Sequence, residues 1–434
     1  MVRYPKRYMQ AGYIALFTIA FLTGCASYTD STREIRSLYR SGAWSEALVK
    51  LDESKQMKED KNRLLFLLER AMILDGLGER PKSRAALIEA DKVADALYTS
   101  SISRTASSLV VSESSSDYVG EDYEKVAIHS MLALSFIEDK DYEAARVEAR
   151  KINNKLNEIN GRYEEKKNKY NDDAFARYLS ATIYESKGDV DSAIIDYTKA
   201  LEAFEGSYRE FSGAGVPDEL VKALYHLLVE RDRSDKIAAL SKGFGKQVAE
   251  AKSEAATVKS GGSIVVVHEL GNIAVKTTSE HIFPIGGQVV RFSFPIINKP
   301  ATYNYGSTGF SIENSSKFYR GEFVQDLDAI AKQTLEDRRG RYILKQGVRL
   351  LAKGQLTEQA RQNFGELAGI AANVFTAVSE TADTRSWTLL PGALFVTRAN
   401  VKAGRHDLTI KTDGKIKKLT AVDVKKGEIV ILRM

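Results

Sequence analysis

Cys25 is the only cysteine among the 434 residues, and it follows a basic and then an apolar segment. The chain begins with three basic residues and no acidic one: Arg3, Lys6 and Arg7. The apolar run that follows, residues 11–22, is too short to cross a bilayer as a stable helix and is typical of a secretory signal. A cysteine thiol can carry diacylglycerol on its sulfur. Cleavage before Cys25 would then free an amine for a further acyl chain.

Residues 22–25, Leu-Thr-Gly-Cys, resemble the bacterial lipobox, so we expect cleavage between Gly24 and Cys25. Several acyl chains give stable attachment, because each buried CH₂ contributes roughly 0.8 kcal/mol and one chain anchors only marginally. Ala26 stands where, by resemblance to the sorting rule of bacteria with two membranes, Asp would favour inner-membrane retention. We therefore expect an outer-membrane lipoprotein facing the periplasm, with surface exposure left open. The alternative is an uncleaved anchor followed by a free cysteine.

Composition limits the remaining possibilities. Removal of residues 1–24 lowers the formal charge from +5 to +2, which is not the balance of a nucleic-acid-binding protein. With its one cysteine acylated, the chain has no disulfide and depends on its packed core. The length suggests two or three domains. Residues 1–24 are expected to be the signal peptide, which is removed.

Residues 173–204 resemble a tetratricopeptide repeat, in which small residues let two antiparallel helices approach and a glycine, here Gly188, forms the turn. Three weaker copies lie upstream, with turns at Gly42, Gly78 and Lys140, the last where glycine is usual. Their irregular spacing implies two insertions. The sequence thus predicts an α-solenoid of degenerate helix pairs over 25–250. A plain helical bundle is the alternative.

In a stack of such pairs, the first helices line a concave groove. We predict that groove positions on the two best repeats contact a protein partner. They are Ala127, Ser130, Leu134, Ile137, Phe175, Tyr178, Thr182 and Glu185.

From about residue 255 the apolar period changes to that of strands, with turn signals at Gly404, Asp413-Gly414 and Lys426-Gly427. A helical block, 323–380, interrupts the strands. The fold class is therefore α+β, with a small β-sandwich-like domain over 255–434 that contains this helical insertion. Residues 402–434 resemble small surface β-sandwich modules of the PEGA type.

Asp383, Arg385 and Trp387 alternate, so in a strand they would share one face. Asp383 and Arg385 could pair while Trp387 packs beside the guanidinium. Two interpretations remain open: a polar latch that fixes the helix-to-strand turn, or a binding site for a peptide or glycan. The segment 117–126, Asp-Tyr-Val-Gly-Glu-Asp-Tyr-Glu-Lys-Val, is likewise either a helix cap or a recognition loop.

The common catalytic motifs are missing from the sequence, including His-Glu-x-x-His, Gly-x-Ser-x-Gly and the phosphate-binding loop. The five histidines show no metal-ligand spacing, so we expect no metal and no cofactor. A pair of catalytic carboxylates stays open. A basic stretch that begins at Arg338, Arg339 and Arg341 is either a solvated helix face or a contact for anionic lipid or glycan.

Cys25 together with segments 117–126, 145–153 and 382–387 resembles a family of bacterial outer-membrane lipoproteins with tetratricopeptide-like repeats and a C-terminal β-domain. Members tend to be encoded near lipoproteins linked to peptidoglycan-synthase activation, which implies an envelope role. We therefore expect a non-enzymatic scaffold, anchored in the membrane through Cys25, that binds an envelope protein through its groove. The alternative is a peptidoglycan- or glycan-binding module that uses the C-terminal domain.

Overall fold

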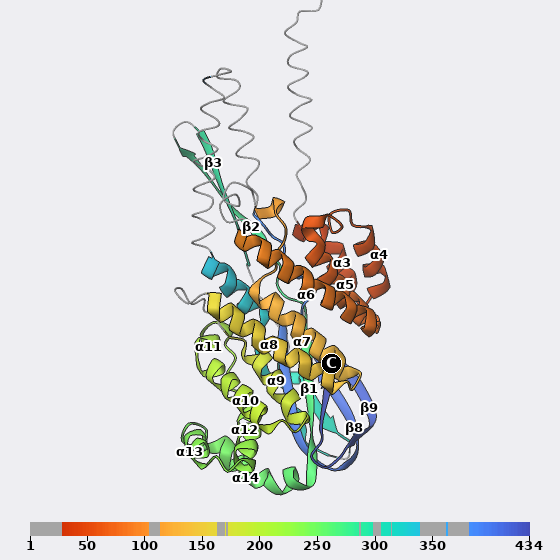
Figure 1. Ribbon diagram of the computed structural model, residues 1–434. Coiled ribbons are helices and arrows are strands. Elements are labelled where there is room, and N and C mark those ends of the chain that lie inside the picture. The colour runs from red at the N-terminus through yellow and green to blue at the C-terminus, as the bar shows by residue number, and fades with distance from the viewer. Residues whose placement is uncertain are drawn as a thin grey trace, which may run out of the picture.

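The structure is a computed structural model that describes residues 28–103, 113–162, 170, 172–285, 288–297, 305–313, 315–338, 362 and 382–434. Helices occupy the first part of the chain and strands the second, which confirms the predicted α+β class (Figure 1). Within the described residues, no helix combines the length and the hydropathy that a membrane-spanning segment requires.

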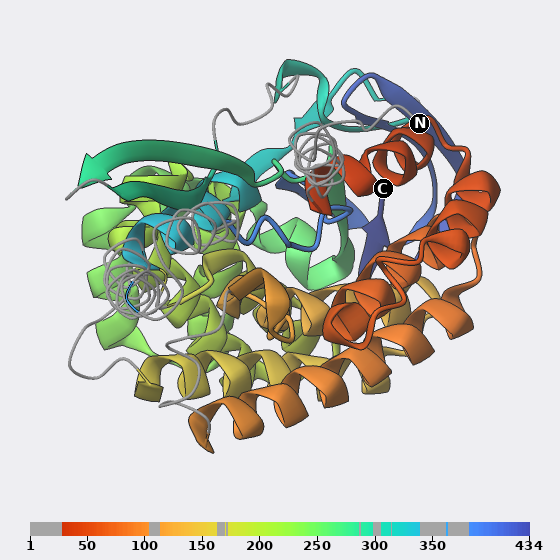
Figure 2. The ribbon, with the colours of Figure 1, turned by 90° about the horizontal axis from the view of Figure 1, so that it is seen from above.

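The helices form a curved array of antiparallel pairs. They are α2 (Tyr28–Ser31), α3 (Arg33–Arg40), α4 (Trp44–Glu53), α5 (Arg63–Gly76), α6 (Arg80–Ser103), α7 (Asp122–Glu138), α8 (Tyr142–Arg162), α9 (Ala174–Ser186), α10 (Val190–Glu205), α11 (Ser207–Ser212), α12 (Asp218–Glu230), α13 (Ser234–Gly243) and α14 (Gly245–Ser260). Seen from above, this array curves around one side of the strands (Figure 2).

The same turn joins the two helices of five pairs in the described chain. Its central residue has a left-handed backbone, with φ of 80°, 76°, 59°, 70° and 52° at Gly42, Gly78, Lys140, Gly188 and Asp232. The next residue donates its N–H to the carbonyl five positions earlier, as Glu79 does to Leu74 at 2.9 Å. This is the Schellman helix end, which satisfies the last carbonyls of the first helix. The expected tetratricopeptide-like helix pairs are confirmed, and the pair α12–α13 adds one that the sequence did not indicate.

The strands form two four-stranded sheets and a hairpin. They are β1 (Gly261–Leu270), β2 (Thr277–Ile285), β3 (Gln288–Ile296), β4 (Gly309–Ile312), β5 (Phe318–Arg320), β6 (Glu322–Asp326), β7 (Ala393–Lys402), β8 (Gly404–Thr412), β9 (Lys415–Val424) and β10 (Ile429–Arg433). The inner sheet has the order β10-β1-β7-β6, and the outer sheet has the order β5-β4-β8-β9. Strands β2 and β3 form the separate hairpin.

The inner sheet lies between the helices and the outer sheet. Along β1, Val265 and Val267 belong to the apolar core shared with the helices, whereas Ile264 and Val266 belong to a second core shared with the outer sheet. This follows from the two-residue period of a strand, which places alternate side chains on opposite faces. Strand β10 pairs in parallel with β1, with Ser263 opposite Ile429, and β7 pairs with β1 in the antiparallel sense.

The predicted boundary of the helical insertion is wrong at its start. Phe323 belongs to β6, where it pairs with Phe395, and the helix begins only at residue 327. Asp326 ends the strand and caps this helix, because its carboxylate accepts the N–H of Ala329 at 2.8 Å. Residues 339–361 and 363–381 of the predicted insertion lie outside the described residues. The helical array continues to Ser260, beyond the predicted end at residue 250.

Candidate functional site

The predicted groove is covered by the inner sheet. Seven of the eight predicted contact residues are buried: Ala127, Ser130, Leu134, Ile137, Phe175, Tyr178 and Thr182. A cavity of about 10 Å³, the room of about one water molecule, lies between α9 and the sheet. Three of the predicted groove residues of α9, together with Leu179, face β1, β7 and β10 across it; the lining is Phe175, Tyr178, Leu179, Thr182, Val265, Val267, Val396 and Ile431. The expectation that these residues lie open to a partner is therefore corrected: the apolar inner face of the helices packs against the chain's own strands.

The eighth residue, Glu185, fixes the sheet in the groove. Its carboxylate accepts two hydrogen bonds of 2.7 Å from Arg398 of β7 and one of 2.6 Å from the hydroxyl of Tyr197. Both partners are buried. Burial alone would lower the pKa of Arg398, but the negative charge of Glu185 raises that pKa by more. The guanidinium therefore stays charged.

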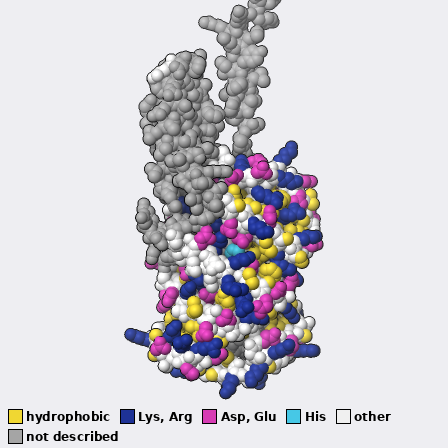
Figure 3. Space-filling model, in the orientation of Figure 1, with side chains coloured by type: hydrophobic (Ala, Val, Ile, Leu, Met, Phe, Trp, Pro, Cys, Tyr) yellow, Lys and Arg dark blue, Asp and Glu magenta, His cyan; other side chains and the backbone are white. Residues whose placement is uncertain are grey.

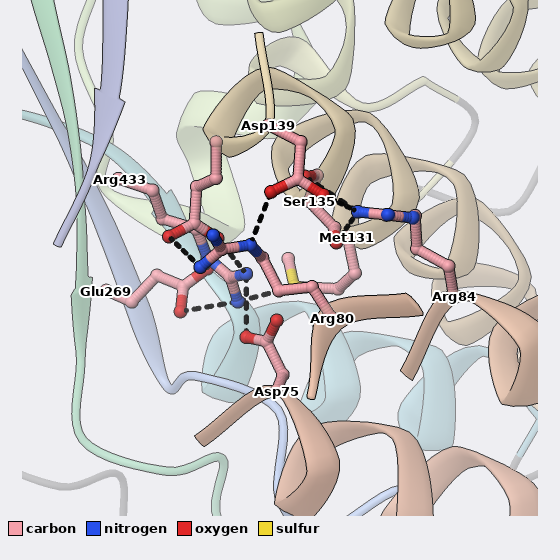
Figure 4. Close-up of polar contacts among 9 residues, drawn as sticks. Asp75, Arg80, Arg84, Met131, Ser135, Asp139, Glu269 and Arg433 are labelled. Carbon is pink, nitrogen blue, oxygen red and sulfur yellow. Dashed lines mark hydrogen bonds and ion pairs between the residues drawn. The ribbon is translucent and has the colours of Figure 1, made fainter. Parts of the chain in front are cut away.

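A second arginine, Arg433, whose side chain is 7% exposed, links β10 to the helices (Figure 4). Arg433 contacts three acidic residues: Asp75 at 2.7 Å, Glu269 at 2.8 Å and Glu138 at 3.3 Å. These acids come from α5, β1 and α7. A single side chain near the C-terminal end of the sequence therefore joins two helix pairs and the central strand.

A junction of buried carboxylates lies where the N-terminal residues, α5, the start of α7 and segment 382–389 meet. Its first member is Glu124, which accepts the hydroxyl of Tyr118 at 2.7 Å and the N–H of Glu121 at 2.9 Å. The second bond is the return half of a capping box. Glu124 also accepts the N–H of Trp387 at 2.7 Å, so two of the three segments that the resemblance singled out, 117–126 and 382–387, contact one another. Burial and the charge of Glu121 raise the pKa of Glu124.

Arg385 makes the latch that was one of the two interpretations of segment 382–387. It pairs with Asp383 at 2.7 Å and donates to Asn62 Oδ1 at 3.1 Å, which links the segment to the start of α5. The strand expected here is not formed, and the ring under the guanidinium is that of Tyr118, 5.4 Å away, not that of Trp387. Trp387 is fully buried in the apolar core. The geometry favours the structural latch over an exposed peptide or glycan site.

Glu121 joins the junction to the base of the β2–β3 hairpin. Lys276, the residue before β2, donates to Glu121 at 2.7 Å, and Arg338 forms an ion pair with the same carboxylate. Burial alone would raise the pKa of Glu121, but the charges of Arg338 and Lys276 outweigh it and hold that pKa at about 2. Arg338 is thus engaged inside the protein and is not presented to a glycan. Arg339 and Arg341 lie outside the described residues.

Glu69 is the third carboxylate. It accepts the N–H of Thr388 at 2.7 Å, its hydroxyl at 2.8 Å and the N–H of Leu389 at 3.0 Å. The hydroxyl of Tyr28 donates to it at 3.3 Å. Burial outweighs these hydrogen bonds and raises the pKa of Glu69 to about 7. The sequence reasoning missed Glu69, because a glutamate within a helix carries no signal of burial; the apolar residues on both sides of it were the only hint.

The junction joins chain segments and presents no acid to a substrate, since Glu69, Glu121 and Glu124 are each less than 5% exposed. Groups of His, Cys, Asp and Glu that could hold a metal are missing from the part of the chain that the structure describes. His268 of β1 lies between the hydroxyls of Thr412 and Thr397, at 2.7 and 2.9 Å. Burial lowers its pKa to about 4. Gly24 and Cys25 lie outside the described residues.

On the face shown in Figure 3, acidic and basic side chains are interspersed over the helices.

No protein-family model matches the sequence, and no curated protein matches it. Among solved structures, MamA of strain AMB-1 is 14% identical with a TM-score of 0.30, over 51% of this chain and 90% of that one. MamA from Desulfovibrio magneticus RS-1 is 16% identical with a TM-score of 0.29, over 52% and 94%. A Podosopora anserina putative kinesin light chain with TPR-like repeats is 10% identical with a TM-score of 0.31, over 51% and 95%.

Proposed function

We propose that this protein is a non-catalytic scaffold of the bacterial outer membrane, anchored through acylated Cys25 and facing the periplasm. It binds an envelope protein on its outer surface, because its groove is filled by its own inner sheet. The helical pairs and the β-domain act as one rigid body in this role.

The observation that supports this proposal best is the packing of the residues directly after Cys25. Tyr28 is 4% exposed and donates to Glu69, and Thr29 Oγ1 donates to the carbonyl of Lys276 at 2.7 Å. Tyr28 follows Cys25 by three residues in the sequence. A lipid on that cysteine would therefore hold the junction and the base of the β2–β3 hairpin close to the membrane.

Metabolic labelling with a palmitate analogue tests the anchor. We expect label on the full chain in envelope fractions that band with the outer membrane, and loss of both label and membrane association in Cys25→Ala. Because one acyl chain anchors only marginally and several anchor stably, the release should be nearly complete. Unlabelled protein, or Cys25→Ala protein that still bands with the outer membrane, would contradict the proposal.

Photo-crosslinking in cells tests the scaffold role. A photoreactive residue at the exposed position Ile195 or Val229, on the outer side of the helices, should give an adduct with an envelope protein. The matched control is the same residue at the buried position Thr182, where only bonds within the chain are expected. Adducts to other proteins from Thr182 alone would contradict the proposed outer surface and would show that the partner binds in the groove.

A further inference from the structure

Strand β9 presents an open edge. In the described part of the chain it pairs with β8 on one side only, from Thr412 opposite Lys415 to Gly404 opposite Val424. Its residues are mostly exposed, unlike those of the central strands β1 and β7. The N–H and C=O groups on the free side of an edge strand can pair with a further strand. In Figure 1, β9 lies at the lower right, away from α3 near the start of the described chain.

The edge is strongly basic. Segment 402–426 contains eight basic and three acidic residues. One of the three acids, Asp407, is used internally, since it accepts the N–H of Ala421 at the bulge of β9. Lys415, Lys417 and Lys418 are exposed, and within the described residues none of these three forms an ion pair with an acidic residue. Their charges are therefore available to an external group.

The edge also carries an apolar side chain. Ile416 is 63% exposed, the most exposed of the large hydrophobic residues in the described chain, and it lies between Lys415 and Lys417. On the same sheet, the ammonium group of Lys411 lies 5.9 Å from the ring of Phe318. The surface thus combines cations, a hydrophobic contact and an unpaired backbone edge.

These features select a particular occupant. Lysines on an edge strand oppose pairing with other strands of the same sign, so two copies of β9 would bring like charges together. Opposite charges on facing strands attract instead. A lipid or glycan polyanion would meet the lysines but would leave the N–H and C=O groups of the edge without partners.

We propose that the free edge of β9 binds an extended acidic segment of a partner protein, which joins the outer sheet as an additional strand. Main-chain hydrogen bonds along the edge provide affinity, and the lysines give specificity for an acidic sequence. This inference rests on the proposed scaffold function and names the chemistry of its partner. Peptide binding and acylation are measured separately, so failure of one does not imply failure of the other.

The test measures fluorescence anisotropy with the purified full chain in detergent micelles. The probe is a labelled ten-residue peptide in which Glu and Val alternate. Two further peptides serve as controls: one alternates Lys and Val, and one keeps every Glu but replaces two central Val residues with Pro, which cannot pair as a strand. The variant Lys415→Glu/Lys418→Glu is compared with Lys236→Glu/Lys252→Glu, which makes the same charge change at exposed positions of α13 and α14.

We expect the Glu-Val peptide to bind, more weakly as salt is raised, and at least tenfold more weakly to Lys415→Glu/Lys418→Glu. The Lys236→Glu/Lys252→Glu chain should bind the Glu-Val peptide as the unmodified protein does. The unmodified protein should bind the Pro-containing peptide at least tenfold more weakly than the Glu-Val peptide.

Equal binding of the Pro-containing peptide and the Glu-Val peptide would overturn the proposal, since it would show a surface for polyanions. Competition by purified sacculi with no effect of Pro would assign the surface to a glycan. A change in sedimentation between the two double variants would assign the edge to a second copy of this chain. The competition by sacculi, the change in sedimentation, or a lack of binding of the Glu-Val peptide would each overturn the proposal as well.

Discussion

Arg398 of β7 grips Glu185 of α9 through two parallel hydrogen bonds of 2.7 Å, one from each terminal nitrogen. Arg398 also donates to the hydroxyl of Tyr197 at 3.1 Å. The contact connects the inner sheet to the helix whose face was expected to bind a partner. Because the pair is buried and bidentate, it determines how the sheet sits in the groove.

Replacing Arg398 with Ala should lower the free energy of unfolding by about 3–5 kcal/mol, because it leaves the largely buried carboxylate of Glu185 without its cationic partner. Urea denaturation measures this loss. The matched control is Arg231→Ala, which removes an exposed ion pair with Asp191 and should change the free energy of unfolding by less than about 0.5 kcal/mol. In Arg398→Ala/Glu185→Ala the loss should be smaller than the sum of the single losses. Additive losses would show that the two residues act independently.

The groove should be closed to reagents in solution. In a Cys25→Ala chain, a cysteine at Thr182 should react with a thiol reagent at least about 100-fold more slowly than a cysteine at Ile195, since reaction at Thr182 requires the sheet to open. Thr182 is 3% exposed and Ile195 is 54% exposed. Stopped-flow labelling gives both rates. Similar rates would mean that the sheet leaves the groove readily.

Stability should depend on pH through Glu69. The pKa of Glu69 rises from its ordinary value of 4.5 to about 7 on folding, so the folded protein holds this proton more tightly than the unfolded chain. The contribution is therefore complete below pH 4.5 and is lost as the pH rises towards 7, with a slope of at most about 1.4 kcal/mol per pH unit. Urea unfolding at several pH values measures the slope.

The control for Glu69 is Glu69→Gln, which should remove that part of the slope and should also destabilise the fold by about 1–3 kcal/mol, because the new amide meets the N–H groups of segment 388–389. Glu322, Asp173 and Asp326 have raised pKa values as well, and their part of the slope should persist in the variant. Identical slopes in the two proteins would show that Glu69 is ionised in the folded state across this range.

The latch at Arg385 should require a guanidinium. Lysine cannot pair with both oxygens of Asp383 and also reach Asn62, so Arg385→Lys should cost about 1–3 kcal/mol and speed hydrogen exchange of the amides in 384–389. Arg33→Lys is the matched control, because Arg33 pairs with Asp30 at the surface. If the amides in 384–389 exchange at the same rate in the two variants, Arg385 does not hold this segment in place.

The helical repeats were predictable because their turns follow local rules. Gly42, Gly78 and Gly188 mark left-handed helix ends that glycine adopts without steric cost. Lys140 was located by the small and aromatic residues on either side of it, such as Ala133, Tyr142 and Ala145. Asp232 was missed, since neither its type nor its spacing marks it as such a turn.

What fills the groove could not be predicted. The inner face of α9, with Phe175, Tyr178 and Thr182, has the same pattern whether it faces a partner or a strand of its own chain. Which surface packs against this face depends on Val265 and Ile431, which lie far from α9 in the sequence. The junction was missed for a similar reason, because its contacts join residues such as Glu69 and Thr388 that are 319 positions apart.

The parallel pairing of β10 with β1 sets the order in which the protein can mature. Synthesis proceeds from the N-terminus, so the helices and β1 emerge well before β10, whose Ile429 pairs with Ser263. Until then the acidic groups that Arg433 neutralises stay unpaired, and part of the apolar face of the helices is uncovered. In the proposed lipoprotein, acylation would occur at Cys25, near the other end of the chain. Newly made molecules would thus reach the lipid-modifying enzymes before they can close, and a periplasmic holding chaperone would be needed during that interval.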